Sequence, residues 1–295
     1  MSLGGERFEI RAGGYRAEIA EVGGSLGGLW HDGVAVTVES TPEALPPKST
    51  GAVLMPWPNR IRDGRYRFDG VDHQLALTEP TKSNAIHGLA RWARWSVLER
   101  GQSSVRLGHD LVPQPGYPFP LRLELRYELA ADSGLSVRAS AHNTGLKTAP
   151  FGAGFHPYVD LAAADLDHAR LQVPAATVLI ADEQQIPTGR RSVAGTPYDF
   201  QRVRPVGSLR LDDGFRDLQS SVAFVESAER AVEVRWDEAF CYLQVFTAAD
   251  VTPGRNAIAI EPMTCPPNAF ASGEGLLRLE PDREWSGSWG IRRLR

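Results

Sequence analysis

The stretch LRLELRYEL, residues 121–129, alternates apolar and charged side chains without a break. This period of two is that of a β-strand with one face on a core and the other toward solvent. A turn-like segment, AADSG, follows at residues 130–134, and residues 135–141 then repeat the alternation. We therefore predict that the two segments form an antiparallel hairpin with one buried face.

Other segments rich in β-branched and aromatic residues stand between clusters of Gly, Pro, Asp and Asn, which is typical of strands and turns. The predicted strands span residues 15–22, 65–68, 95–99, 104–111, 170–173, 231–236, 242–247, 257–260 and 289–294. No segment of twelve or more residues carries a clean helical period. We predict an all-β chain of large antiparallel sheets packed face to face. Without a linker, composition shift or repeat, residues 1–295 are expected to form a single domain.

The composition argues against two classes of partner. The chain has 295 residues and a net charge of −4, so it lacks the positive excess that neutralises a phosphate backbone, and nucleic acid is not expected as a partner. The first residues, MSLGGER, contain no apolar signal core, and no run approaches the roughly 20 apolar residues of a membrane span. We expect a cytoplasmic protein without a membrane partner; the oligomeric state stays unknown at this stage.

Signatures of metal and cofactor sites are absent from the sequence. The seven histidines and two cysteines form no His-x-His, His-Glu-x-x-His or Cys-x-x-Cys pattern, so no metal is expected. Neither a phosphate loop nor a Gly-x-Gly-x-x-Gly fingerprint occurs, so no cofactor is expected. The GGSLG segment at 23–27 matches Gly-x-Ser-x-Gly, but the GLWHDG that follows cannot form the helix that this motif requires. We interpret it as a turn.

Four segments set ionisable groups beside turn residues instead of inside an alternating strand. They are PNRIRDG at 58–64, NAIHG at 84–88, GFHPY at 154–158 and IAIEPMT at 258–264. In the last, an apolar run ends in Glu261 and Pro262, which predicts a carboxylate at a strand end where a site can open. Taken singly, Arg60 could pair with a surface acid, and His87 and His156 could be satisfied core or turn residues. Together the segments predict a functional site.

These segments resemble the aldose 1-epimerase family, and the resemblance extends over almost the whole chain. The segments NRI at 59–61, NAIHG at 84–88, GYP at 116–118, HPY at 156–158, LDDGF at 211–215, EPMT at 261–264 and WSGSW at 285–289 are similar to the family's motifs in the same order. The resemblance implies a β-supersandwich fold of the galactose mutarotase type. It also implies that His156 is a general acid and Glu261 a general base. The substrate-binding residues that we carry over or favour by their position are Arg60, His87, Asp212, Asn84 and Trp57. Asp213, next to Asp212, stays an alternative.

The implied reaction interconverts the α and β anomers of a hexose, so a monosaccharide is the expected ligand. The C1 hydroxyl loses a proton, the ring oxygen gains one, and the ring opens and closes again, which requires neither a redox step nor a metal. We expect the acid and the base on opposite sides of the sugar. A carboxylate such as Asp212 beside His156 would keep the imidazole protonated. Either Arg60 keeps Glu261 ionised or partial burial raises its pKa.

Alternatives remain at this level. A hexose-6-phosphate 1-epimerase would need cations for the phosphate, with Arg62, Arg91 and Arg94 as candidates. A carbohydrate-binding protein without turnover would keep the fold alone. A glycosidase would need two carboxylates across a glycosidic bond. The chain resembles a divergent bacterial branch, which leaves glucose, galactose, and phosphorylated or sulfonated hexoses open as substrates.

Overall fold

The computed structural model describes residues 3–295; Met1 and Ser2, the first two residues of the domain predicted over 1–295, lie outside the described residues. The prediction of an all-β chain is confirmed. Helical elements in the described chain are short: α1 (Ala269–Ser272), η1 (Pro47–Ser49), η2 (Pro80–Lys82) and η3 (Ala90–Trp92). Within residues 3–295, no helix has the length and apolar character needed to cross a membrane.

The predicted hairpin forms as expected. β12 (Leu121–Ala130) and β13 (Gly134–Asn143) pair antiparallel over their whole length. The apolar side chains of β12 are buried, with Leu125 0% and Tyr127 1% exposed, while its charged side chains lie on the opposite face. The alternation of residues 121–129 therefore corresponds to the two faces of a sheet.

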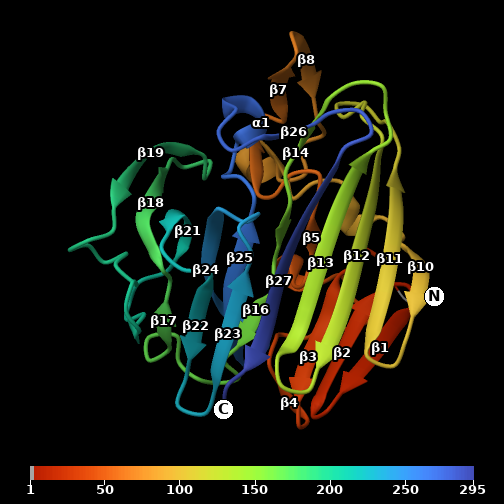
Figure 1. Cartoon of the computed structure of the whole chain (residues 1–295). Helices are drawn as coiled ribbons and strands as arrows, with labels where there is room; N and C mark the ends of the chain where they lie inside the picture. The colour runs from red at the N-terminus through yellow and green to blue at the C-terminus, as the bar shows by residue number, and fades with distance from the viewer. Residues whose placement is uncertain (1–2) are drawn as a thin grey trace.

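This hairpin belongs to a nine-stranded antiparallel sheet. Its strands, in spatial order, are β10 (Ser96–Arg100), β11 (Ser104–Leu111), β12, β13, β27 (Glu284–Arg293), β23 (Ala231–Trp236), β22 (Val222–Glu226), β17 (Arg170–Gln172) and β20 (Arg204–Pro205). The C-terminal strand β27 lies between β13 and β23, so the two halves of the sheet meet on it. Figure 1 shows β10–β13 and β27 side by side in this sheet.

A second large sheet carries the polar segments 154–158 and 258–264. Its strands, in spatial order, are β19 (Pro187–Ser192), β18 (Ala175–Ala181), β21 (Asp212–Leu218), β24 (Tyr242–Thr252), β25 (Arg255–Met263), β15 (Gly154–Phe155) and β5 (Val53–Leu54), and β16 (Tyr158–Asp160) also pairs with β25. The two large sheets meet in a common core, where the rings of Phe155 and Trp289 lie 5.4 Å apart. The expectation of large packed antiparallel sheets is thus met.

Smaller sheets complete the fold. They are β1 (Arg7–Ala12), β2 (Tyr15–Ala20), β3 (Leu26–His31) and β4 (Val34–Ala35) in one sheet, and the pairs β14 (Ala149–Phe151) with β26 (Leu277–Leu279), β6 (Arg60–Arg62) with β9 (Asn84–Ile86), and β7 (Arg65–Phe68) with β8 (Val71–Gln74). The four-stranded sheet lies behind β11 and β12 in Figure 1 and is tied to that layer by tyrosines. The Tyr127 hydroxyl donates to the Gly24 carbonyl (2.6 Å), and the Tyr15 hydroxyl donates to the Arg293 carbonyl (3.3 Å).

Strand boundaries differ from the predictions in one place that matters for function. The strand predicted at 257–260 continues as β25 through Glu261 and Pro262 to Met263, so Glu261 lies two residues before the strand end that was expected at Glu261 itself. Pro262 removes one backbone donor, but Leu243 of β24 still stands opposite it and the pairing continues. Glu261 is therefore held in a sheet, which fixes the direction of its side chain.

The buried face of β12 generates a stability prediction. Leu125→Ala removes a fully buried side chain from the core and should lower the free energy of unfolding by about 2–5 kcal/mol. Glu128→Ala, on the exposed face of the same strand, should change it by less than about 1 kcal/mol. Urea denaturation followed by fluorescence measures both. Equal effects of the two variants would contradict the assigned faces.

Candidate functional site

The two predicted catalytic residues face each other across neighbouring strands. β15 and β16 both pair with β25, and His156 and Pro157 form the break between them. Tyr158 stands opposite Ala259, so two residues along each strand place His156 opposite Glu261. The imidazole Nε2 of His156 lies 3.3 Å from Oε1 of Glu261. Both side chains are nearly inaccessible, at 7% and 2% exposure.

The backbone at the break is anchored on its other side. The N–H of His156 donates to the Ala52 carbonyl (3.1 Å), and the His156 carbonyl accepts from the N–H of Gly51 (3.0 Å). The ring of Tyr158 stacks on the imidazole, with centroids 4.8 Å apart, and its hydroxyl donates to the Lys48 carbonyl (3.1 Å). Backbone and ring contacts together fix the orientation of the imidazole.

The same sheet face continues on the other side of Glu261. Gln244 of β24 pairs with Glu261, and its Nε2 donates to Oδ1 of Asp212 on β21 (2.8 Å). Phe246, two residues along β24, lies on the same face as Gln244. We call this row, from Asp212 to His156, the floor of the site. It brings together three of the predicted residues, which are Asp212, Glu261 and His156.

The β6–β9 pair forms what we call the roof of the site, and its turns are strained. Asn59 before β6 and His87 after β9 have φ angles of 54° and 63°, and the His87 N–H donates to the Asn59 carbonyl (2.9 Å). A Cβ at Gly88 would lie 2.1 Å from the Met55 carbonyl oxygen, so a larger residue does not fit. These left-handed positions bring the His87 ring edge-on to His156, with centroids 5.5 Å apart.

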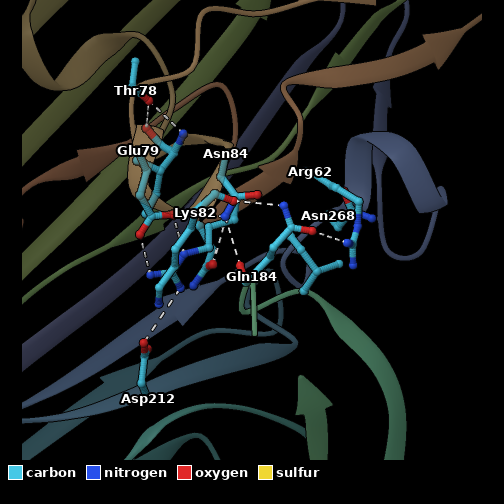
Figure 2. A network of polar contacts seen from close by, with 12 residues as sticks. Arg62, Thr78, Glu79, Lys82, Asn84, Gln184, Asp212 and Asn268 are labelled. Atoms are coloured by element: carbon cyan, nitrogen blue, oxygen red, sulfur yellow. Dashed lines mark hydrogen bonds and ion pairs between the residues drawn. The ribbon is translucent and has the colours of Figure 1, made fainter. Parts of the chain in front are cut away.

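Arg60 connects the roof to the floor. Its Nε and Nη2 donate to both carboxylate oxygens of Glu79 (2.8 and 3.0 Å), and its Nη1 lies 3.9 Å from Oδ2 of Asp212. Asn84 donates from Nδ2 to Glu79 (3.1 Å) and to the Gln184 carbonyl (2.9 Å). Figure 2 shows this network running from Asp212 through Glu79 and Asn84 to Gln184. Asn84 thus supports Glu79.

Floor and roof enclose a cavity of about 400 Å³. Its lining residues are Lys48, Ser49, Asn59, Arg60, Thr78, Glu79, Ile86, His87, Arg91, His156, Tyr158, Asp212, Phe246 and Glu261. Asp212 lines the cavity and Asp213 does not, which favours the first of the two aspartates. Neither Asn84 nor Trp57 is a lining residue: Trp57 is buried in the core against Tyr117 and Phe270. Phe246 is the phenylalanine that faces the cavity.

Burial dominates the protonation of the central pair. It lowers the pKa of His156 to about 3, and the positive charges of Arg60 and Arg91 act in the same direction. Burial also raises the pKa of Glu261 well above its usual value; Asp212 adds to this effect, and Arg60 opposes it. Burial therefore favours the neutral imidazole and the protonated carboxyl group over the charged pair. Of the two possibilities raised for Glu261, burial prevails.

Two expectations about this pair differ from the structure. Asp212 was expected beside His156, but the carboxyl group next to the imidazole is that of Glu261. Asp212 lies instead by Arg60 and Gln244. The acid and base were also expected on opposite sides of the ligand, whereas His156 and Glu261 are adjacent on one sheet face. The strand register explains both differences, because it places His156 directly opposite Glu261 on the neighbouring strand.

The floor and roof also contain residues that sequence reasoning missed. Glu79 holds Arg60, while Lys48 and Phe246 line the cavity. A buried arginine requires an acidic partner, but the sequence does not show which of many acids supplies it. Among residues 3–295, no group of three or more His, Cys, Asp or Glu side chains is placed to hold a metal ion.

The chain matches a known protein family over almost its whole length. The family model for aldose 1-epimerase matches residues 6–292. The chain belongs to the aldose 1-epimerase family. Among the relatives, the uncharacterized protein YihR of Escherichia coli K12 is 35% identical over 99% of this chain and 96% of its own length. The aldose 1-epimerase of the same organism is 32% identical over 55% of this chain and 48% of its own length.

Solved structures agree on the fold. A putative aldose 1-epimerase from Escherichia coli K12 matches with a TM-score of 0.85 and 21% identity, and covers 98% of both chains. The galactose 1-epimerase from Lactobacillus acidophilus NCFM matches with a TM-score of 0.79 and 21% identity, over 96% of this chain and 92% of its own. At these identities the likeness establishes the galactose mutarotase-like fold, and the roles of the site residues are argued below.

Proposed function

We propose that this chain is an aldose 1-epimerase that interconverts the α and β anomers of a hexose by acid–base ring opening and closure. The observation that carries the proposal is the buried His156–Glu261 pair, with 3.3 Å between nitrogen and oxygen, beneath a cavity of about 400 Å³. Perturbed ionisable groups that converge on a pocket are a mark of acid–base catalysis. His156 acts as the general acid and Glu261 as the general base.

The close placement of His156 and Glu261 suits the reaction. The hydroxyl oxygen and the ring oxygen of an aldose are both bonded to C1, so the two proton transfers occur at neighbouring atoms. An acid and a base side by side on one surface can therefore reach both atoms of the same sugar. The break at His156 and the fixed direction of Glu261 provide this arrangement.

The protons balance over the cycle. Glu261 as carboxylate takes the proton of the C1 hydroxyl, the C1–O bond to the ring oxygen breaks, C1 becomes the aldehyde carbon, and the imidazolium of His156 protonates the former ring oxygen. Rotation about C1–C2 followed by the reverse transfers gives the other anomer. Ring opening thus converts carboxylate plus imidazolium into carboxyl plus imidazole, the state that burial favours. One shared proton serves both directions.

The remaining lining residues suit a monosaccharide. Arg60 supplies donors and Asp212 supplies acceptors for sugar hydroxyls, and His87 lies beside His156 at the inner end of the roof. Phe246 offers an apolar face for the C–H side of the ring. We propose these contacts in place of the one expected for Trp57, which is buried in the core.

Removing either member of the pair should abolish most of the rate enhancement. His156→Ala and Glu261→Gln should each lower kcat by about 10²–10⁴ because one proton transfer loses its partner. Polarimetry of freshly dissolved α-D-glucose and α-D-galactose measures the rate, with Glu128→Ala as a control on the far sheet. If the wild-type protein does not accelerate the interconversion of these sugars or of phosphorylated and sulfonated hexoses, the result would favour a sugar-binding protein without turnover.

The shared proton predicts the pH dependence. Below about pH 3 the imidazole takes up a second proton, and no base remains available. As the pH rises through the raised pKa of Glu261, the pair loses its proton and none is left for the ring oxygen. We expect kcat/KM to fall on the alkaline side, measured by polarimetry after subtraction of buffer catalysis. A rate that climbs steadily with pH would contradict the shared-proton assignment.

A second candidate, an epimerase of a phosphorylated hexose, is favoured by one observation. Arg91 and Lys48 line the cavity, and neither has an ion pair among residues 3–295. The Nη1 of Arg91 donates to the hydroxyl of Ser49 (3.2 Å), and burial lowers the pKa of Arg91. Arg62 and Arg94, the other two candidates, pair with Asp182 and Glu21 respectively, outside the cavity lining.

If the substrate is anionic, Arg91 should determine the preference for the phosphorylated sugar over the neutral sugar. If glucose 6-phosphate is preferred over glucose, Arg91→Gln should reduce that preference about tenfold, because a charge-assisted contact is lost. Arg94→Gln is the matched control, since Arg94 is exposed and does not line the cavity. Comparison of kcat/KM for the two sugars gives the answer. A wild-type preference for the neutral sugar, unchanged in Arg91→Gln, would exclude this candidate.

A further inference from the structure

Glu79 is fixed by more contacts than its place in a loop before η2 would suggest. Its backbone N–H donates to the Asn84 carbonyl (2.9 Å) and its carbonyl accepts from the N–H of Asn84 (3.2 Å), so it is tied to the start of β9. The Asn84 side chain donates to Glu79 Oε2 (3.1 Å). The same carboxylate accepts two hydrogen bonds from Arg60.

The support of Asn84 comes from a distant part of the chain. The Gln184 carbonyl accepts from Asn84 (2.9 Å), and Gln184 Nε2 donates to the Lys82 carbonyl (3.1 Å). The side chains of Asp182 and Gln184 in the β18–β19 turn also accept from Arg62 of β6. Figure 2 shows Arg62, Asn84 and Gln184 meeting at this point. The turn therefore secures both strands of the roof, and with them Glu79.

From this geometry we propose that Glu79 is a positioning residue: it holds the Arg60 guanidinium against the roof and limits how much of its positive charge reaches Glu261. The inference rests on the proposed function, since it concerns the base of that reaction. Arg60 stands between two carboxylates, bidentate on Glu79 and 3.9 Å from Asp212 of the floor. Glu79 sets the position of the Arg60 guanidinium between these two carboxylates.

Several charged and titratable groups surround Glu261, and each has to be considered. They are His156 between β15 and β16, Tyr158 on β16, Asp212 on β21, Arg60 on β6, Glu79 before η2, His87 after β9, Arg91 on η3 and Lys48 on η1. Asp212 and Arg60 act on the carboxyl group directly and in opposite directions. Glu79 acts through Arg60, because it touches the guanidinium and Asn84 and not Glu261.

Neutralising Glu79 should therefore change the pKa of Glu261 in one direction. Burial alone would raise the pKa of Glu79, but the hydrogen bonds from Arg60 and Asn84 outweigh it, so Glu79 is ionised. Without that negative charge, Asp212 and Glu261 on the floor are the acidic groups left to attract Arg60. The guanidinium then favours the ionised form of Glu261, and the pKa of Glu261 falls.

The test compares Glu79→Gln, Glu79→Asp and Arg60→Gln by ¹³C NMR titration of the glutamate carboxyl groups, with Glu261 assigned by its absence in Glu261→Gln. Glu79→Gln should move the Glu261 midpoint down by roughly one pH unit or more, and Arg60→Gln should move it up. Glu79→Asp keeps the charge but shortens the side chain, so it should leave the midpoint near wild type and raise KM about tenfold. Glu233→Gln, which removes the buried partner of Arg292, is the matched control.

Either Glu79 variant can overturn the proposal on its own. An unchanged Glu261 midpoint in folded Glu79→Gln, or an unchanged KM in Glu79→Asp, would show that Glu79 does not position Arg60. Thermal unfolding verifies that each variant is folded. The NMR titration needs no turnover, so it separates this inference from the proposed function: a wild type inactive on every aldose would defeat the function, while the direction of the midpoint shift would still decide the role of Glu79.

Discussion

The site depends on the burial of one carboxyl group against one imidazole. Removing either group from water disfavours its charged form, which lowers the pKa of His156 and raises the pKa of Glu261. The sheet makes the burial possible. β25 pairs continuously with β24 on one side, and on the other side the break between β15 and β16 places His156 opposite Glu261.

The roof holds a cation, the Arg60 guanidinium, close to this pair while Glu79 limits its effect on the ionisation of Glu261. Arg60 is buried, and a buried guanidinium needs carboxylates to offset its desolvation. Glu79 supplies most of that compensation from the roof, and Asp212 supplies less from the floor. Left-handed backbone at Asn59 and His87 lets the two strands end abruptly at the cavity, so that polar side chains reach it without long loops.

Much of this could be predicted from the sequence, for identifiable reasons. The strict alternation of residues 121–129 has only one regular structure that buries one face, so the β12–β13 hairpin was predictable. His156, Glu261 and Arg60 stand out because ionisable residues interrupt apolar runs beside turn formers. What failed depends on register and distance: the sequence does not show that His156 and Glu261 are cross-strand neighbours. Nor does it show which acid pairs with Arg60, or that Trp57 turns into the core.

The lining of the cavity divides cleanly along the chain. The lining residues fall into two stretches, residues 48–91 and residues 156–261. The proposed acid and base lie in the later stretch together with Asp212 and Phe246, and the earlier stretch supplies Arg60, His87 and Arg91. Changes confined to the earlier stretch can alter which hydroxyl or charged substituent is recognised while the later stretch keeps its acid and base. A duplicated gene could follow this route to a new sugar, and a designer could follow it by exchanging a segment of fewer than about fifty residues, well below the size of a typical domain.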